Sequence, residues 1–145
     1  MSTSKNNKST LSDTPQGSLL LRTLAMPADT NPNGDIFGGW IMSQMDIGGG
    51  ILAHEIAQGR VVTVAVESMT FFKPVSVGDV VCCYGRCLRI GNTSMQIKVE
   101  VWVKNLAGNG VRYQVTEAVF TFVAIDEQGV PRPIPQDHLA ITPES

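Results

Sequence analysis

The chain has 145 residues and a formal net charge of −2, from 11 Lys and Arg against 13 Asp and Glu. This length suits one domain with a substantial hydrophobic core. The charge balance argues against nucleic acid or an anionic membrane as the main partner, because both call for a clustered basic surface, and no apolar run approaches the roughly 18 residues of a membrane span.

Both ends of the chain are expected to lie outside the domain. Residues 1–17 are rich in Ser, Thr, Asn and Lys and lack the apolar stretch of a signal peptide, so they predict a disordered tail and a cytoplasmic protein. Residues 128–145 contain several prolines and predict a loosely attached C-terminal tail. The folded domain is therefore predicted to span residues 18–127.

The first half of the domain predicts one strand and one long helix. Residues 18–26 form a short strand that ends at Pro27, and a loop dense in Asn, Pro and Gly follows at residues 29–39. The helix is expected from about residue 39 to 58, with Gly59 as its C-terminal cap. It is apolar on nearly every side, which is typical of a buried helix.

Two features of this helix do not suit a purely structural element. Asp46 has no Lys, Arg or His three or four residues away, and an unpaired buried carboxylate is energetically costly. Gly48, Gly49 and Gly50 each cost about 1 kcal/mol relative to Ala in a helix interior. We expect another backbone or a ligand to approach the helix closely at that turn.

The second half of the domain predicts four strands, at residues 60–72, 80–90, 93–104 and 111–125. In the third of these, apolar residues at every second position from Met95 to Val103 predict a half-buried antiparallel strand. Trp102 lies on its other side, where it is expected to serve in further assembly. Short turns join the four strands, and short turns connect antiparallel neighbours.

The sequence therefore predicts an α+β fold in which a curved antiparallel sheet wraps around one long central helix. A sheet of about five strands leaves exposed edges that favour pairing with a second copy, so we expect at least a homodimer. Cys82, Cys83 and Cys87 crowd into one strand without the spacing of a disulfide framework or a metal site. They predict buried thiols in a reducing compartment.

The start of the helix and Asp46 suggest a reactive site. Gly38 and Gly39 leave the helix N-terminus open, and such an end binds an oxyanion. Nearly two turns later, the Asp46 carboxylate is placed to act as a general base on water or as a nucleophile toward an acyl carbon. The alternative is structural: Asn33 or Asp35 only caps the helix, and Asp46 makes a polar contact with backbone donors or a neighbouring subunit. The spacing of the residues leaves both interpretations open.

Four segments carry a resemblance to a known family. They are D-x-N-x-N-G-D-I-F-G-G-W-x-M-S-Q-M-D-x-G-G from Asp29, G-R-V-V-T-V-A-V-E-S-M from Gly59, K-P-V-S-V-G-D-V-V-C-C-Y from Lys73 and E-V-W-V-K from Glu100. In this order the segments resemble the hotdog-fold acyl-CoA thioesterases of the YciA type, over roughly residues 18–135.

The resemblance implies a hotdog fold and a homodimer with active sites between its subunits, commonly assembled as a trimer of dimers. It implies hydrolysis of acyl-CoA thioesters of broad chain length to free acid and CoA, without a metal or other cofactor. It further implies that Asp46 is the catalytic acidic residue, that Asn31 works opposite it from the partner subunit, and that the amides of Gly38 and Gly39 polarise the thioester carbonyl. Whether Asp46 attacks the carbonyl or activates water stays open.

Coenzyme A carries phosphates, so cationic side chains are expected at the mouth of the site. The candidates are Arg60, Lys73, Arg86 and Arg89. Each of them is equally compatible with ordinary surface charge. Ser68, on the strand edge at residues 66–69, is expected to accompany the pantetheine arm.

Two other functions remain as alternatives. A hydratase or dehydratase acting on acyl thioesters needs a His paired with an acid, and residues 29–46 contain no His. His54 lies about 12 Å further along the helix than Asp46 and is interpreted as a residue near the helix end. A non-catalytic module that binds acyl-CoA on the same fold is the other alternative.

Overall fold

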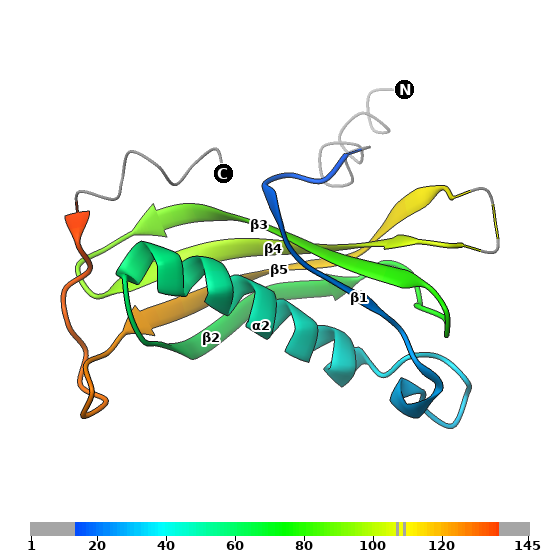
Figure 1. Cartoon of the computed structure of the whole chain (residues 1–145), viewed down its shortest axis with the longest axis horizontal. Helices are drawn as coiled ribbons and strands as arrows, with labels where there is room; N and C mark the ends of the chain where they lie inside the picture. Colours follow the sequence, from blue (N-terminus) through cyan, green and yellow to red (C-terminus); the bar gives the residue numbers. More distant parts are fainter. Residues whose placement is uncertain (1–13, 107, 109, 137–145) are drawn as a thin grey trace.

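The computed structural model describes residues 14–106, 108 and 110–136, and in this part of the chain one long helix lies across one sheet (Figure 1). In chain order the elements are β1 (Ser18–Leu24), the short 3-10 helix η1 (Pro27–Asp29), α2 (Gly38–Ala57), β2 (Val61–Phe71), β3 (Val80–Ile90), β4 (Ser94–Lys104) and β5 (Arg112–Ala124). The predicted α+β architecture is confirmed, and each long element ends within about two residues of its prediction. Most of the predicted N-terminal tail, residues 1–13, and the end of the C-terminal tail, residues 137–145, lie outside the described part.

The five strands form one antiparallel sheet in the order β1-β3-β4-β5-β2. β2 is an edge strand that pairs with β5, from Val61 opposite Ala124 to Phe71 opposite Thr116. Residues 73–79, predicted as a turn between neighbouring strands, instead belong to the segment that crosses the sheet from β2 to β3. The prediction failed here because β2 pairs with β5 over its whole length, from Val61 to Phe71, and not with β3. Val75, only 1% exposed, anchors the crossing segment in the core.

The core lies between α2 and the face of the sheet that it covers (Figure 1). The inward-facing residues of β4 are each at most 1% exposed, as their alternation predicts: Met95, Ile97, Val99, Val101 and Val103. The large side chains that α2 buries are Ile41, Met45, Leu52 and Ile56. Burying an apolar side chain of this size stabilises the fold by roughly 1.5–3 kcal/mol, so these two rows hold the helix on the sheet.

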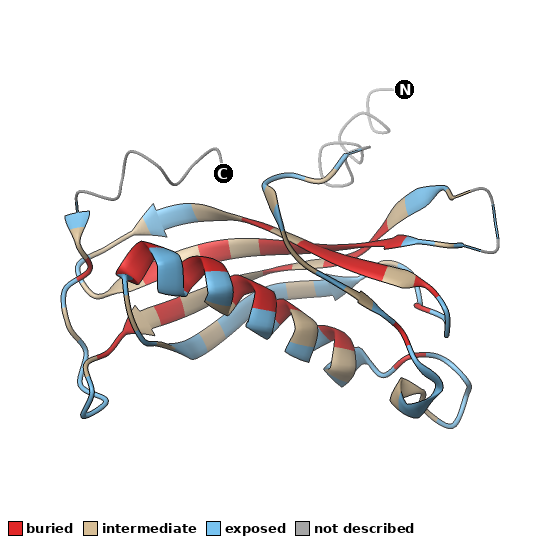
Figure 2. Ribbon diagram, in the orientation of Figure 1, coloured by how far each residue is buried: buried red, intermediate tan, exposed pale blue. Residues whose placement is uncertain are grey.

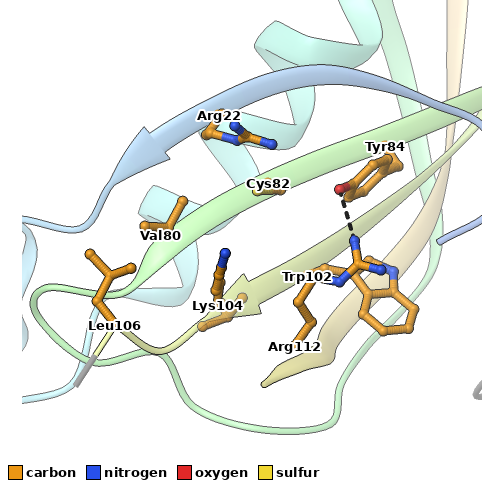
Figure 3. Close-up of a pocket in the computed structure, with 9 residues that line it drawn as sticks. Arg22, Val80, Cys82, Tyr84, Trp102, Lys104, Leu106 and Arg112 are labelled. Atoms are coloured by element: carbon orange, nitrogen blue, oxygen red, sulfur yellow. Dashed lines mark hydrogen bonds between the residues drawn. The ribbon is translucent and has the colours of Figure 1, made fainter. Parts of the chain in front are cut away.

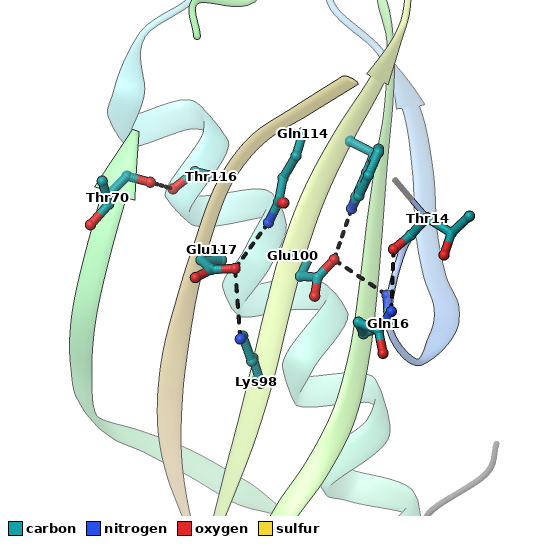
Figure 4. A network of polar contacts seen from close by, with 9 residues as sticks. Thr14, Gln16, Thr70, Lys98, Glu100, Gln114, Thr116 and Glu117 are labelled. Atoms are coloured by element: carbon teal, nitrogen blue, oxygen red, sulfur yellow. Dashed lines mark hydrogen bonds and ion pairs between the residues drawn. The ribbon is translucent and has the colours of Figure 1, made fainter. Parts of the chain in front are cut away.

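The outer face of the sheet is also partly covered. Glu100 and Trp102 of β4 are each only 3% exposed. The Trp102 indole Nε1 donates to Glu100 Oε1 over 2.8 Å, and the backbone N of Gln16 donates to the same oxygen over 3.3 Å (Figure 4). The residues just before β1 therefore lie against this face, and Trp102 is already buried within one chain. Its predicted role in assembly stays a prediction, and it is not an exposed surface residue.

The helix α2 is buried on only one side, and buried and exposed positions alternate along it (Figure 2). Ile47 is 52% exposed and Ile51 is 43% exposed, whereas Met45 is fully buried. The prediction of a helix buried on every side is therefore wrong for the single chain. The physical reason is geometric, because an open sheet covers one face of a helix and leaves the opposite face to another molecule or to water.

The triple glycine of α2 explains how closely helix and sheet approach. A Cβ on Gly49 would lie 3.2 Å from Val99 Cγ2 and 3.3 Å from the Phe122 ring, and a Cβ on Gly48 would lie 3.4 Å from Cys83 Cβ. What approaches at these two positions is the side-chain layer of the chain's own sheet, which corrects the expectation of another backbone or a ligand. Gly50 differs, since its Cβ would meet only one ring carbon of Phe122, at 3.8 Å.

The segment after β5 is attached to the domain more firmly than predicted. Ile134 is 2% exposed and belongs to the core. The Arg132 guanidinium donates to the carbonyl of Ala57, the last residue of α2, over 2.9 Å, and to the carbonyl of Ile125 over 3.1 Å. Residues 128–136 therefore cover the C-terminal end of the helix.

The residue in the left-handed conformation at the end of α2 is Gln58, with φ 56°, which corrects the assignment of Gly59 as the cap.

The three thiols lie where the strand pattern placed them. Cys82 and Cys83 are buried and Cys87 is half-buried, all of them unpaired. Burial raises the pKa of Cys83 to about 12 and raises the pKa of Cys87 as well, so both thiols stay protonated at neutral pH.

In the described part of the chain, no helix is both long and apolar enough to cross a membrane.

Candidate active site

The Asp46 carboxylate lies on the open side of α2, at the boundary with β2. Asp46 is exposed in the single chain, and its Oδ1 accepts a hydrogen bond of 2.5 Å from the Thr63 hydroxyl. The expectation of a buried, unpaired carboxylate is therefore wrong, because the strand that follows the helix supplies a hydroxyl partner. Among the described residues, none forms a hydrogen bond with the other carboxylate oxygen, Oδ2, so this oxygen is available to a bound molecule.

Thr63 is a candidate site residue that the sequence did not identify. It lies 17 residues after Asp46 and belongs to a run of strand-forming residues in which a Thr is ordinary. Local spacing could not reveal the contact, because it depends on how β2 returns alongside the helix. The only signal was a single hydroxyl within an otherwise apolar stretch, at residues 61–66.

The helix N-terminus is open, as predicted. Phe37 is the N-terminal cap residue, and no side chain caps the helix. The Phe37 carbonyl accepts from the amides of Trp40, over 3.1 Å, and Ile41, over 3.3 Å. The alternative in which Asn33 or Asp35 caps the helix is therefore wrong, and the amides of Gly38 and Gly39 stand at an exposed end without an acceptor among the described residues.

Asn31 organises the loop that leads into the helix. Its side-chain Oδ1 accepts from the backbone amides of Asn33, over 2.9 Å, and Asp35, over 3.1 Å. Its own backbone amide donates to the Asp35 carbonyl over 2.7 Å. The loop is thus held by the oxygen of the side-chain amide, which leaves the Asn31 NH₂ group as a hydrogen-bond donor for another molecule.

A groove of about 360 Å³ brings three of the predicted site residues together. Its lining residues are Asn31, Asp35, Ile36, Gly38, Ile41, Phe71, Phe72, Lys73, Pro74 and Val75. Lys73 contributes the one cationic side chain of this set, and its Nζ lies 5.3 Å from the centre of the Tyr113 ring. The groove thus combines an amide donor, the helix N-terminus and a positive charge, a combination that suits a polar anionic ligand.

Asp46 does not line this groove, and the helix geometry explains why. Gly38 and Asp46 are eight positions apart on α2, which corresponds to about 12 Å along the helix axis. One carbonyl group cannot rest on the amides at the helix start and also lie within reach of Asp46 on the same helix. The structure therefore separates the predicted site into two parts of one chain.

The other predicted residues lie apart from both parts. Arg60, before β2, donates from Nη1 to the carbonyls of Asp126 and Glu127, over 3.4 and 3.3 Å. Ser68 has a φ of 57° and lies at an irregular point of the β2–β5 pairing, between Glu67 and Thr70. The single chain brings neither of them to the groove or to Asp46.

Two further residues discussed from the sequence are also placed away from Asp46. Arg86 is opposite Lys98 in the β3–β4 pairing. Cys83, three residues earlier on β3, faces the helix, and successive side chains of a strand point to opposite faces of the sheet. Arg86 therefore lies on the face turned away from α2. His54 is exposed in the last turn of α2, where its interpretation as a residue near the helix end is confirmed. His54 and Asp46 are eight positions apart on α2, which is about 12 Å along the helix axis, so these two residues do not form an acid–His pair.

A second hollow, of about 400 Å³, lies on the outer face of the sheet (Figure 3). Its lining includes the cationic side chains Arg22, Lys104 and Arg112, and the Arg112 guanidinium donates to the Tyr84 hydroxyl over 3.4 Å. It contains none of the predicted site residues, and the sheet separates it from Asp46. We therefore place the candidate active site on the helix side.

Comparisons with known proteins identify the family of the chain. A family model for the thioesterase superfamily matches residues 33–107, just over half of the chain. The acyl-CoA thioester hydrolase YciA of Salmonella typhimurium is 68% identical over 128 residues, which cover 87% of this chain and 96% of that protein. The crystal structure of a hexameric broad specificity acyl-coenzyme A thioesterase has a TM-score of 0.83 at 68% identity, and the match covers 88% of this chain and 89% of that one.

A more distant relative has also been solved, with and without single substitutions. An acyl-CoA hydrolase from Staphylococcus aureus, solved in complex with coenzyme A, has a TM-score of 0.74 at 29% identity, over 79% of this chain and 68% of that one. In that protein, an Asn and an Asp fifteen positions apart were replaced by Ala in separate structures. By its family model and its high identity over most of its length, the chain belongs to the thioesterase superfamily and is a hotdog-fold acyl-CoA thioesterase of the YciA type.

Proposed function

We propose that the protein hydrolyses acyl-CoA thioesters of broad chain length to free carboxylic acid and CoA, at sites formed between two copies of the chain. The observation that carries the proposal is the Asp46 carboxylate, which is held by the Thr63 hydroxyl on the open side of α2 and has one oxygen free. Neither a metal nor another cofactor is part of the proposal, and a cytoplasmic location stays a prediction.

The proposed chemistry uses Asp46 against a polarised carbonyl. In one route the carboxylate attacks the thioester carbon, the bond to sulfur breaks, the CoA thiolate leaves and is protonated, and water then hydrolyses the mixed anhydride. In the other route Asp46 removes a proton from water as the oxygen attacks, and the proton passes to the leaving thiolate. Both routes develop negative charge on the carbonyl oxygen, which the amides of Gly38 and Gly39 are placed to stabilise.

The separation within one helix supports a site built from two chains. Asn31, Gly38 and Lys73 share one groove, and Asp46 lies about 12 Å further along the helix. We propose that the Asn31 loop and the helix N-terminus of one chain face Asp46 and Thr63 of the other. In this arrangement Lys73 would lie on the side where CoA enters, while Ser68, Arg60, Arg86 and Arg89 stay predictions.

The exposed apolar surface supports the same arrangement. It includes Met42, Ile47 and Ile51 of α2 and Val62, Val64, Val66 and Phe71 of β2, each at least 38% exposed. β2 is also an unpaired sheet edge in the single chain. A second copy that pairs along β2 would cover both features, because it would continue the sheet and bring the two helices together. The hexamer of the related thioesterase is compatible with three such homodimers.

Mixing of two inactive variants tests the two-chain site. Asp46→Asn keeps the shape of the side chain and removes its charge, and Asn31→Ala removes the side-chain amide. Each variant alone is expected to lose CoA release by at least about 100-fold. Coexpression of the two restores roughly a quarter of the sites if the residues act from different chains, because mixed dimers then contain one intact site. Mixing restores no activity if both residues act within one chain.

The same assay separates the alternatives. A protein that binds acyl-CoA and releases no thiol would be a binding module. Conversion of an enoyl-CoA to a hydroxyacyl-CoA without thiol release would indicate a hydratase. Full activity of Asp46→Asn would show that the carboxylate is not catalytic.

A further inference from the structure

Gly50 is the one residue of the triple glycine at which the packing of the single chain leaves room for a side chain. At Gly49 an added Cβ would lie 3.2 Å from Val99 Cγ2, closer than nine in ten real Cβ contacts, whereas at Gly50 it would meet only Phe122 Cε1, at an ordinary 3.8 Å. Gly50 is helical and half-buried. An Ala would therefore fit within the single chain and would favour the helix, so something outside the single chain must account for the glycine.

The position of Gly50 on the helix points to the reacting carboxylate. It lies four residues after Asp46, so the two residues are neighbours on the same face of α2, about one turn apart. Two other residues of this open surface, close to Gly50 on the helix, are apolar, since Ile47 is 52% exposed and Ile51 is 43% exposed. Asp46 is thus followed, one turn along the helix, by a position without a side chain that lies beside exposed apolar residues.

We propose that the space at Gly50 holds the acyl chain of the substrate, beginning a few carbons beyond the carbonyl, and that Gly50 sets the acceptance of long acyl chains. This inference rests on the proposed thioesterase function with Asp46 at the reacting carbonyl. An acetyl group ends at the carbon next to the carbonyl and does not reach one helical turn further. A hexanoyl or longer chain does, and it gains contact with the apolar side chains of Ile47 and Ile51.

The other occupant to consider is the helix of a second copy. If Gly50 contacts a partner helix, an added group between the two helices lowers the stability of the oligomer and reduces kcat/KM for every substrate alike. If Gly50 contacts the acyl chain, the added group reduces kcat/KM according to the length of that chain. Oligomer mass and chain-length dependence therefore distinguish the two occupants.

The test is the kcat/KM of Gly50→Ala for acetyl-, butyryl-, hexanoyl-, decanoyl- and palmitoyl-CoA. We expect acetyl-CoA hydrolysis to stay within about threefold of wild type and the value for hexanoyl-CoA and longer chains to fall at least about tenfold, as one methylene group in an apolar pocket is worth roughly that much. Gly50→Ser is expected to show the same dependence, with a small loss of kcat/KM for acetyl-CoA and a large loss for the longer chains. The Tm of both variants does not fall, because the added group has room within the chain.

A matched control adds the same methyl group elsewhere. Gly91→Ala lies in the turn between β3 and β4, where the new Cβ would be 3.4 Å from Ser94 Oγ, and its chain-length profile is expected to equal that of wild type. An unchanged profile for Gly50→Ala would overturn the inference. So would an equal loss for all substrates, or a loss of oligomer mass in sedimentation. A wild-type protein that hydrolyses none of the five substrates would instead refute the proposed function.

Discussion

The Thr63 hydroxyl of β2 donates a hydrogen bond of 2.5 Å to the Asp46 carboxylate of α2. A carboxylate with one oxygen fixed has fewer orientations, and its second oxygen keeps a defined direction. The contact also ties the edge strand to the helix, on the surface that we propose a second copy covers. Thr63 is thus a positioning residue of the proposed reaction.

Replacement of Thr63 tests this role. Thr63→Val keeps the branched shape and removes the hydroxyl, and we expect kcat to fall about 10- to 100-fold, because a hydrogen bond to a charged group is worth roughly 1.5–3 kcal/mol. Thr63→Ser keeps a hydroxyl and should recover most of the activity. A purely structural role would predict a lower Tm with unchanged kcat, so steady-state kinetics and thermal unfolding are measured together.

The attachment of residues 128–136 predicts a stability effect at Ile134. This side chain is 2% exposed, and Ile134→Ala is expected to lower the free energy of unfolding by about 2–4 kcal/mol through the lost burial and the cavity left behind. Val130, 53% exposed in the same segment, provides the control, and Val130→Ala should change stability by less than about 0.5 kcal/mol. Urea unfolding of both variants gives the comparison. Equal stabilities would mean that the segment does not contribute to the core.

The apolar surface on α2 and β2 predicts the effect of a charge placed on it. Val64 is 55% exposed on the edge strand, and Val64→Lys would bury an unpaired ammonium group if a second copy pairs there. We expect a smaller mass in sedimentation velocity and at least a tenfold loss of CoA release, because the site needs both chains. Val130→Lys introduces the same charge away from this surface and should keep the wild-type mass. Wild-type mass for both variants would place the interface elsewhere.

The buried thiol of Cys83 predicts how stability changes with pH. Burial raises its pKa from 9.0 to about 12, so the unfolded chain loses this proton at a lower pH than the folded one. The stability contributed by the protonated thiol is complete below about pH 9 and is lost as the pH rises toward 12. Between about pH 8 and about pH 10.5, wild type should lose on the order of 1–2 kcal/mol more unfolding free energy than Cys83→Ala. Equal losses of unfolding free energy in the two proteins would show that the Cys83 thiol ionises as readily in the folded state as in the unfolded state.

The sequence by itself determined the elements and the family. Alternation on β4, the β-branched composition of β2 and β5 and the apolar length of α2 are local signals, and local signals specify which residues form strands and helices. The segments around Asn31 and Asp46 carried the resemblance to the YciA-type thioesterases, and the comparisons confirmed it. Local chemistry also suggested an open helix start at Gly38 and Gly39, but the sequence left a cap by Asn33 or Asp35 open, and the structure decided between the two.

Only the tertiary structure decided how these parts meet, because long-range contacts have no local signature. It paired β2 with β5 at the sheet edge, so residues 72–79 cross the sheet and do not form a simple turn. It assigned Gly48 and Gly49 to helix–sheet packing and left Gly50 open. It also placed Asn31 and Gly38 in one groove and Asp46 beside Thr63, about 12 Å further along the helix. The rigid rise of the helix fixes that separation, and it is the physical reason why we propose a site completed by a second copy of the chain.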